Sequence, residues 1–174
     1  ISDIELGIEI NYLQHTTLVN ADATNLRRFK DNFFNTVLCL GVAHHTPNPK
    51  QVLNECYRIC NNGGKVLFAV YRKHSFYYYD YILLKKTVKL IFRIRFERLF
   101  FPLFRLWFKL LYGLGFLDDK TLLSSVTDRY LSPVVNFIRQ EELEYWIKQL
   151  SFNFVNYTIG YTSRKSVIAV LIEK

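Results

Sequence analysis

The sequence contains no methionine, has only three cysteines, and has no long uncharged apolar run. The cysteines (Cys39, Cys56 and Cys60) are odd in number and lie in apolar or helical surroundings, so we expect reduced thiols in a cytoplasmic protein. In the most apolar part of the chain, the uncharged run at 99–104 holds six residues. A membrane-spanning helix needs about 20, which excludes an integral membrane protein of the helical type. No secretory signal peptide is recognisable. Because even position 1 is not Met, we expect the natural start to lie upstream.

What the sequence does contain is sufficient for one folded domain. Its 174 residues are 50% hydrophobic and 22% charged, which excludes a disordered chain, a collagen-like repeat and a disulfide scaffold. The net charge is +8, and residues 81–112 carry eight Lys and Arg against Glu97 alone. The rest of the chain is close to neutral. The basic balance therefore reflects one local segment rather than a general affinity for polyanions.

Three short apolar runs predict strands in the first half of the chain, at residues 17–21, 34–40 and 65–71. Each run is rich in β-branched or aromatic residues and is bounded by turn formers. Their near-continuous apolarity predicts parallel strands that are buried on both faces. Apolar side chains at helical spacing predict a helix over 49–60, with Gly63 supplying the positive φ of a helix stop. Strand, helix and strand together form a βαβ unit.

The second half has a different pattern. Residues 140–150 predict a helix, and residues 152–159 and 166–172 predict an antiparallel strand pair. We therefore expect an α/β fold: a three-layer Rossmann-like sheet, mostly parallel, with an antiparallel C-terminal strand pair and a helical insertion. The expected parts are a partial cofactor-binding core at 1–73, a helical cap at 74–127 and a return to the core at 128–174.

Several groups suited to ligand binding lie at the ends of the predicted strands. In open α/β sheets, ligands bind at the carboxyl ends of the strands, near a topological switch point. Asp3 would end a strand that begins upstream. Asp22 follows the first predicted strand, and Leu40 and Gly41 follow the second. Two adjacent histidines, His44 and His45, come directly afterwards.

The order and spacing of four short motifs resemble one enzyme family. The motifs are Asp22-Ala23-Thr24-Asn25-Leu26, Phe34-Asn35-Thr36-Val37, Gly41-Val42-Ala43-His44-His45-Thr46, and Arg58 followed by Gly63-Gly64. They resemble the class I S-adenosylmethionine-dependent methyltransferases, in the branch with a Gly-Val-Leu-His-His-Thr-like run after the fourth strand. The resemblance covers residues 1–73 and resumes near residue 128, in the run Asp-Arg-Tyr-Leu-Ser-Pro. Asn35 stands where the family usually has Asp.

This resemblance implies roles for individual residues in holding S-adenosylmethionine. Asp3 would accept hydrogen bonds from the ribose hydroxyls, and Asp22 from the adenine amino group. The amide of Ala23 would contact the adenine ring, while Leu40 and Gly41 would meet the methionine portion. The residue types suit these tasks, because a diol needs a bidentate acceptor and a close backbone approach needs Gly. In the alternative interpretation, Asp22 is only a turn former or helix cap.

His44 and His45 match the histidine pair beside the methyl donor, and they are the candidate catalytic residues. Their ordinary pKa suits proton abstraction near neutral pH, but a purely structural role for at least one of them is an equal alternative. A zinc site needs three or four convergent ligands. Cys39 lies nearby, but Cys56 and Cys60 are spaced for helix packing, so we predict no metal.

The basic and aromatic segment at 77–112 has three interpretations. Lys and Arg recur there at helical spacing beside apolar faces, and Pro102 predicts a break between two amphipathic helices. The segment is either a cap over the catalytic mouth or an attachment to an anionic membrane surface that gives access to a lipid-like acceptor. Nucleic-acid binding ranks third, because the basic residues lie beside bulky aliphatic ones and no recognition motif is present.

The sequence thus predicts a methyltransferase acting on a small-molecule or lipid-like acceptor, with S-adenosylmethionine as its cofactor. The alternative is a non-catalytic methyltransferase-fold module that binds an anionic membrane surface or a protein partner through the basic insertion. We expect a cytoplasmic protein, with peripheral membrane contact through residues 81–112. We also expect the first strand, the glycine-rich loop and the following helix to precede residue 1, so that this chain alone is inactive.

Overall fold

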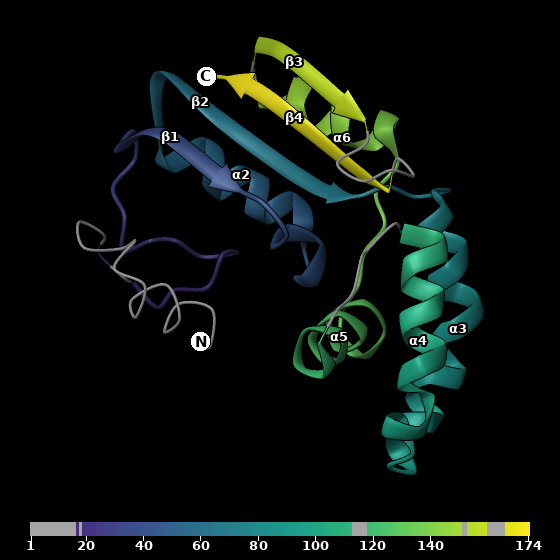
Figure 1. Cartoon of the computed structure of the whole chain (residues 1–174). Coiled ribbons are helices and arrows are strands. Elements are labelled where there is room, and N and C mark those ends of the chain that lie inside the picture. The colour runs from purple at the N-terminus through teal and green to yellow at the C-terminus, as the bar shows by residue number, and fades with distance from the viewer. Residues whose placement is uncertain (1–16, 18, 113–117, 151–152, 160–165) are drawn as a thin grey trace.

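The computed structural model describes residues 17, 19–112, 118–150, 153–159 and 166–174 (Figure 1). The elements follow in the order β1 (Phe34–Cys39), η1 (Ala43–His45), α2 (Pro49–Ile59), β2 (Cys60–Tyr71), α3 (Phe76–Arg93), α4 (Glu97–Tyr112), α5 (Asp119–Val126), η2 (Thr127–Leu131), α6 (Gln140–Gln149), β3 (Asn153–Ile159) and β4 (Val167–Glu173). The structure contains six of the predicted elements, which are β1, α2, β2, α6, β3 and β4, with bounds that differ by a few residues. They exclude the first predicted strand and the helical insertion.

The four strands form one sheet in the order β1-β2-β4-β3. β1 and β2 run parallel, as the βαβ unit predicts, and the predicted antiparallel pairing of the last two strands is confirmed. β4 also lies antiparallel to β2, along a continuous register from Lys65 opposite Glu173 to Tyr71 opposite Val167. Among the strands of the described sheet, only the β1–β2 pairing is parallel. The expectation of a mostly parallel sheet is therefore wrong for this part of the chain, because β4 inserts beside β2.

The strand expected at 17–21 does not form in the residues described there. Residues 19–21 are exposed and irregular, and Asp22 makes only an isolated bridge to Asn25. No described strand pairs with this run. Its apolar composition alone is insufficient, because a strand is stabilised by its neighbours in a sheet.

Helix α2 begins and ends for identifiable reasons. The side chain of Asn48 caps its first turn by accepting a hydrogen bond from a backbone N–H at 3.1 Å,. The helix ends at Ile59, earlier than predicted, because Cys60 adopts an extended backbone and starts β2. Gly63 has the predicted positive φ, 77°. It adopts this conformation inside β2, where its N–H donates to the carbonyl of Lys174 at 2.7 Å.

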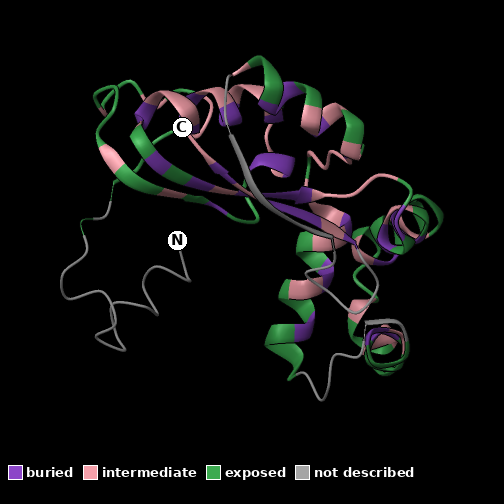
Figure 2. Cartoon of the chain, turned by 90° about the horizontal axis from the view of Figure 1, so that it is seen from above, coloured by how far each residue is buried: buried purple, intermediate pink, exposed green. Residues whose placement is uncertain are grey.

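Helices α2 and α6 pack on one face of the sheet, and Figure 2 shows buried residues on the facing sides of helices and strands. The shared core contains Val52, Leu53, Cys56, Val66, Phe68, Val70, Leu143, Trp146, Ile147, Ile168, Val170 and Ile172. On the opposite face of β1, Leu38 is 65% exposed. The described residues thus form one sheet and one helical layer here, and the third layer of the expected fold is not among them.

Helices α3, α4 and α5, with η2, enclose a second core beyond the end of β2 (Figure 1). Its members are Tyr77, Tyr81, Val88, Ile91, Phe104, Phe108, Leu122, Val126 and Tyr130. The predicted break at Pro102 is wrong. Pro102 lies inside α4, while the chain turns at residues 94–96, where Arg95 has a positive φ of 57°. Pro102 is exposed, so its ring does not disturb the core and only one helical N–H is lost.

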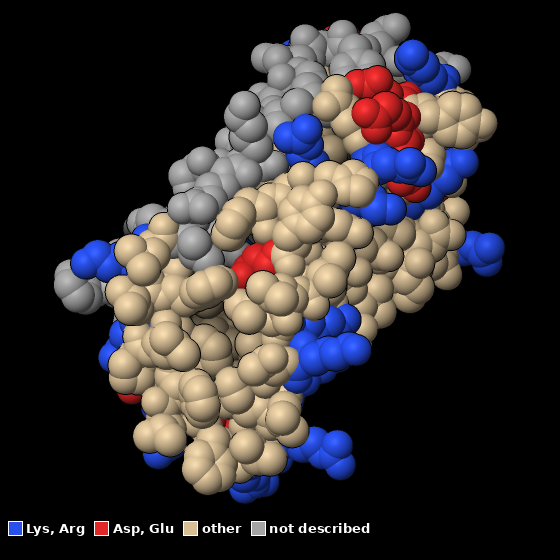
Figure 3. All heavy atoms as spheres, turned by 90° about the vertical axis from the view of Figure 1, so that its right-hand side faces the viewer, with Lys and Arg blue, Asp and Glu red and all other residues tan. Residues whose placement is uncertain are grey.

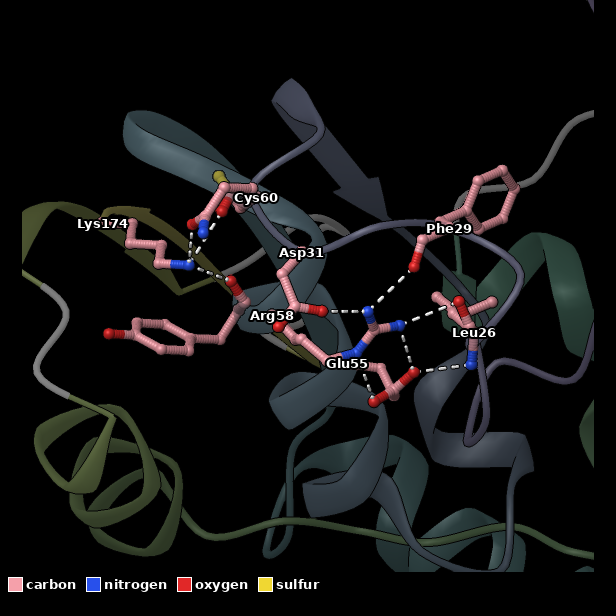
Figure 4. Close-up of polar contacts among 9 residues, drawn as sticks. Leu26, Phe29, Asp31, Glu55, Arg58, Cys60 and Lys174 are labelled. Carbon is pink, nitrogen blue, oxygen red and sulfur yellow. Dashed lines mark hydrogen bonds and ion pairs between the residues drawn. The ribbon is translucent and has the colours of Figure 1, made fainter.

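The loop that precedes β1 is attached to α2 by Arg58 (Figure 4). The guanidinium donates to the carbonyls of Leu26 and Phe29 at 2.8 and 2.9 Å. It also donates to the carboxylates of Asp31 and Glu55 at 2.6 and 2.9 Å. Glu55, only 8% exposed, accepts a further bond from the N–H of Leu26 at 2.6 Å. Hydrogen bonding to Arg58 holds the pKa of Glu55 below its ordinary value.

Lys174 makes a second set of contacts to the same region (Figure 4). Its ammonium group donates to the side chain of Asn32 at 2.8 Å and to the carbonyls of Tyr57 and Cys60 at 2.9 Å each. The end of β4 is therefore bound both to the loop before β1 and to the junction of α2 with β2.

Replacement of Arg58 by Met is expected to lower the free energy of unfolding by about 2–3 kcal/mol, because Glu55 and two carbonyls lose their donor. Chemical denaturation followed by circular dichroism measures this change. The matched control is Lys30→Gln, which removes an exposed charge from the same loop and should change the value by less than about 0.5 kcal/mol. Equal stability of Arg58→Met and the parent protein would contradict the role assigned to Arg58.

Candidate functional site

The carboxyl ends of β1 and β2 lie at the same edge of the sheet because the two strands are parallel,. Gly41 follows β1, the η1 turn contains His44 and His45, and Tyr71 ends β2. The chain after η2 returns to this edge, where the backbone N–H of Asn136 donates to the carbonyl of His44 at 2.8 Å. The predicted candidates after β1 are therefore brought together with residues from much later in the chain.

A cavity of about 330 Å³ lies between the turn that follows Asp22, β1 and α2. Its lining is apolar apart from one hydroxyl and two thiols: Ala23, Leu26, Phe29, Phe34, Thr36, Val37, Leu38, Cys39, Val42, Val52, Cys56 and Ile59. This volume is within the range of small-molecule sites. An apolar cavity next to a carboxylate suits a flat aromatic ring with an exocyclic amine.

Asp22 adjoins this cavity through its neighbour Ala23. One carboxylate oxygen of Asp22 accepts hydrogen bonds from both the N–H and the hydroxyl of Thr24, each at 2.8 Å. These bonds lower the pKa of Asp22. Asp22 therefore stabilises a local turn,. Its second carboxylate oxygen is unengaged by the described residues, so an acceptor for a ligand amine is present at the surface as well.

Gly41 and Leu40 lie at the end of β1, where the sequence placed the methionine portion of a cofactor. Gly41 has a φ of +77°, and a Cβ at this position would meet nothing within 4 Å. The space beside the backbone is therefore open, which fits the close approach of a ligand. Leu40 is 39% exposed. Asp3, the proposed ribose ligand, lies outside the described residues.

His44 is buried, with 2% of its surface exposed. Its ring stacks on that of Tyr71 with centroids 3.6 Å apart, and neither ring nitrogen has a hydrogen-bond partner among the described residues. Burial lowers the pKa of His44 to about 3, so the ring is neutral at physiological pH. This environment favours the structural interpretation of His44 over proton transfer.

His45, in contrast, takes part in a charged contact. Its Nδ1 lies 3.0 Å from the carbonyl oxygen of Val134, and its Nε2 lies 3.4 Å from a carboxylate oxygen of Asp128. The interaction raises the pKa of His45 and lowers that of Asp128. The hydroxyl of Tyr71 donates to the other oxygen of Asp128 at 3.4 Å, and burial raises the pKa of Tyr71 to about 12.

Three residues of this site were not predicted from the sequence: Tyr71, Asp128 and Asn136. Asp128 belongs to the Asp-Arg-Tyr-Leu-Ser-Pro run that contributes to the family resemblance, and this was the available signal. Tyr71 ends a predicted strand and could have been selected by the rule that selected Asp22. Asn136 had no signal, because its contacts with η1 exist only after the return segment has folded onto the sheet.

Within the described ranges, no three His, Cys, Asp or Glu side chains are grouped so that they could hold a metal ion. Cys39, Cys56 and Cys60 are buried free thiols. His45 faces a single carboxylate, that of Asp128.

The pair of His45 and Asp128 contributes to stability when the imidazole is protonated and the carboxylate is ionised. The contribution from His45 is fully present below its ordinary pKa, about 6.5, and is lost as pH rises through the raised pKa. The contribution from Asp128 is fully present above its ordinary pKa, about 3.9, and is lost as pH falls through the lowered pKa. The pair is therefore most effective between about pH 4 and 6.5.

Replacement of Asp128 by Asn is expected to lower the pKa of His45, because the carboxylate that favours the imidazolium is removed. A pH titration of the His45 ring signals by NMR measures this pKa. The matched control is Asp119→Asn, which removes an exposed carboxylate that pairs with Arg105 in the helical segment. An Asp128→Asn protein with the same His45 pKa as the parent would show that the ion pair does not form.

Comparison with known proteins agrees with this geometry. Residues 7–68 match the family model described as a methyltransferase domain. The chain is 31% identical over 72 residues to the ubiquinone biosynthesis O-methyltransferase of Erwinia tasmaniensis, over 41% of this chain and 27% of that enzyme. The corresponding enzyme of Pseudomonas putida is 31% identical over 71 residues, which are 41% of this chain and 28% of the enzyme. The matched stretch thus spans little more than a quarter of these relatives' length.

Among solved structures, an S-adenosylmethionine-dependent methyltransferase of Thermotoga maritima has a similar fold, with a TM-score of 0.52 and 16% identity. The similarity covers 90% of this chain and 62% of that one, and at this identity it concerns the fold alone. The mixed sheet with its helices is accordingly an α/β Rossmann-like fold, and S-adenosylmethionine is the cofactor of such enzymes. Residues 7–68 therefore resemble a methyltransferase domain, and the fold of the described chain is similar to that of an S-adenosylmethionine-dependent methyltransferase.

Proposed function

We propose that the protein transfers a methyl group from S-adenosylmethionine to an oxygen atom of a small-molecule or lipid-like acceptor. The observation that carries this proposal is the pair of His45 and Asp128 at the carboxyl ends of β1 and β2. An imidazole of raised pKa, in the turn that follows Gly41, is suited to accept the proton that a hydroxyl group loses when it is methylated,.

The residues around the cavity fit the cofactor. Ala23 and the other apolar lining residues would contact the adenine ring, and the second oxygen of Asp22 would accept from its amino group. The open backbone at Gly41 would lie along the methionine portion. S-adenosylmethionine supplies an activated methyl group on a sulfonium centre and leaves as S-adenosylhomocysteine.

His45 has one nitrogen for the acceptor proton. Nδ1 donates its hydrogen to the carbonyl of Val134, so Nε2 is the atom that exchanges a proton. The 3.4 Å distance between Nε2 and Asp128 is longer than a good hydrogen bond. This distance leaves no room for an oxygen atom between them, so an acceptor hydroxyl would displace the carboxylate from Nε2 and donate its proton there, while the nearby Asp128 would stabilise the imidazolium that results,. The resting imidazolium must first lose a proton, so activity should rise with pH through the raised pKa of His45.

Oxygen is favoured over nitrogen or carbon as the methylated atom by the matched relatives, which are named as O-methyltransferases. The family model ends at residue 68, before the helical segment begins. The part of the chain that would select the acceptor is therefore not covered by this match.

A second candidate function is a non-catalytic module that retains the methyltransferase fold and binds a membrane surface or a protein partner through its basic helices. It differs from the first in one measurable respect, because such a module does not need to bind the cofactor or its product.

Calorimetric titration with S-adenosylhomocysteine tests the cofactor site on the full-length protein. We expect binding that Asp22→Ala weakens by about 10- to 100-fold, the effect of losing one hydrogen bond to a charged acceptor. The control is Glu141→Ala, which removes an exposed carboxylate on α6 and should not change the affinity. A folded protein that does not bind S-adenosylhomocysteine would refute the catalytic proposal in favour of the module.

His45→Gln tests the proton acceptor, using an acceptor found by screening aromatic hydroxy compounds. We expect kcat to fall by about 10²–10⁴, while S-adenosylhomocysteine affinity is unchanged. The rise of activity with pH that belongs to His45 should also disappear. His74→Gln, an exposed histidine in the turn before α3, is the control. A His45→Gln enzyme with the parent's kcat and pH profile would exclude His45 as the base.

A further inference from the structure

The two longest helices, α3 and α4, present an unusual surface on the side away from their shared core. Each buries one face in the second core, through Tyr81, Val88 and Ile91 on α3 and through Phe104 and Phe108 on α4. Many of the other described side chains of both helices are exposed to solvent. This surface lies outside residues 7–68, so the family match gives no expectation for it.

The open surface of α4 carries a continuous apolar stripe. Leu99, Leu103, Leu106 and Leu110 recur at intervals of four, three and four residues, which places them on one side of the helix,. All four are more than half exposed, and Leu99 is 73% exposed. The stripe is distinct from the buried side of α4, so packing against the described part of the chain does not explain it.

Helix α3 repeats this arrangement. Leu83, Leu90 and Ile94 are spaced by seven and four residues and lie on one side of the helix,. Each is more than half exposed, and Leu83 is 72% exposed. Together, these seven residues of α3 and α4 form what is here named the outer leucine face.

Basic side chains run beside both stripes. On α3 they are Lys86, Lys89 and Arg93, and on α4 they are Arg98, Arg105 and Lys109, with all six exposed. Helical spacing places each basic row next to the apolar row of the same helix. Figure 3 shows this side of the molecule as a broad, mostly uncharged surface that includes an acidic group, with Lys and Arg along its margins. Glu97, the one acidic residue of segment 81–112, is only half exposed at the start of α4.

We propose that the outer leucine face is a docking surface for an anionic lipid bilayer. Large exposed apolar patches mark interaction sites rather than ordinary solvent-facing surface. An apolar helical stripe bordered by Lys and Arg is the arrangement that lies in the plane of a membrane interface, with its apolar side chains among the acyl chains and its cations among the phosphates. None of the helices in the described part of the chain is long and apolar enough to cross a membrane, so the contact is interfacial.

The charge distribution selects this occupant over a second copy of the chain. Two copies that met through the outer leucine face would bring their basic rows together and repel each other, whereas an anionic bilayer neutralises them. The long aliphatic parts of Lys and Arg also allow these residues to lie beside buried leucines while their charges stay at the headgroup level.

Polar contacts connect this surface to the site described above. Asp80 on α3 accepts hydrogen bonds from Trp107 on α4, at 3.2 Å, and from Tyr130 in η2. The hydroxyl of Tyr77 on α3 donates to the carbonyl of Arg129 at 2.8 Å, next to Asp128. Membrane docking does not depend on the proposed catalysis. Delivery of a lipid-borne acceptor to His45 would be its consequence only if that proposal also holds.

Flotation with phospholipid vesicles tests the docking surface on protein without cofactor. We expect the chain to bind vesicles of phosphatidylcholine mixed with phosphatidylglycerol and not vesicles of phosphatidylcholine alone. Lys86→Gln/Lys89→Gln/Arg93→Gln should lower binding by about a hundredfold, at roughly fivefold for each charge near an anionic surface. Leu99→Gln/Leu103→Gln should also lower it at least tenfold. Raising the salt from about 0.1 to about 0.5 M should weaken binding of the parent.

The controls make similar changes elsewhere on the surface. Lys30→Gln/Lys65→Gln/Lys148→Gln removes three exposed charges from the α/β part, and Tyr145→Gln removes an exposed aromatic ring from α6. Both should bind as the parent does, and circular dichroism confirms that every variant is folded. The proposal is overturned by equal binding to neutral vesicles, by equal losses in the control variants, or by absence of vesicle binding from a folded parent. It is also overturned if the leucine substitutions abolish only a concentration-dependent dimer. None of these results depends on whether the protein binds S-adenosylhomocysteine.

Discussion

The guanidinium of Arg58 joins two parts of the chain that meet at the site. Arg58 belongs to the helix that follows η1, and its partners are carbonyls and a carboxylate of the loop that leads from Asp22 to β1. Glu55 completes the network by binding both Arg58 and the backbone of that loop. The apolar cavity lies between these two parts, so its walls are set by a network of charge-assisted hydrogen bonds. Such bonds are directional, whereas apolar packing is not. They therefore both attach the loop to α2 and determine its position.

Local patterns predicted the elements whose stabilising contacts are local or periodic. The apolar spacing located α2, and β2 and β4 were visible as short apolar runs rich in β-branched residues. The run at 17–21 had the composition of a strand, but its described residues have no neighbouring strand, and composition does not supply one. Pro102 was assigned to the helix break because proline disfavours helix interiors, but an exposed position tolerates the loss of one hydrogen bond.

The site residues that directly follow β1 were predictable from the sequence. The residues that distant parts of the chain contribute to the site were not. Gly41, His44 and His45 follow β1 directly, so the rule about strand ends found them. The partners that distinguish the two histidines are Tyr71, Val134 and Asp128, and these come from β2, η2 and the segment after it. The sequence does not distinguish His44 from His45. The tertiary contacts place His44 in a buried, apolar environment and pair His45 with a carboxylate.

The difference between His44 and His45 also determines how protons couple to the folding of this part of the chain. The unfolded chain holds a proton on His44 in mild acid that the buried ring does not accept, so acidification below about pH 6.5 favours unfolding through this residue. Above about pH 6.5 the folded chain still holds a proton on His45 that the unfolded chain has released, so stability falls through this residue as pH rises through its raised pKa,. Folding therefore releases a proton from His44 below about pH 6.5 and takes up a proton on His45 above it. The combined contribution of the two rings to stability is greatest near the pKa of a free histidine.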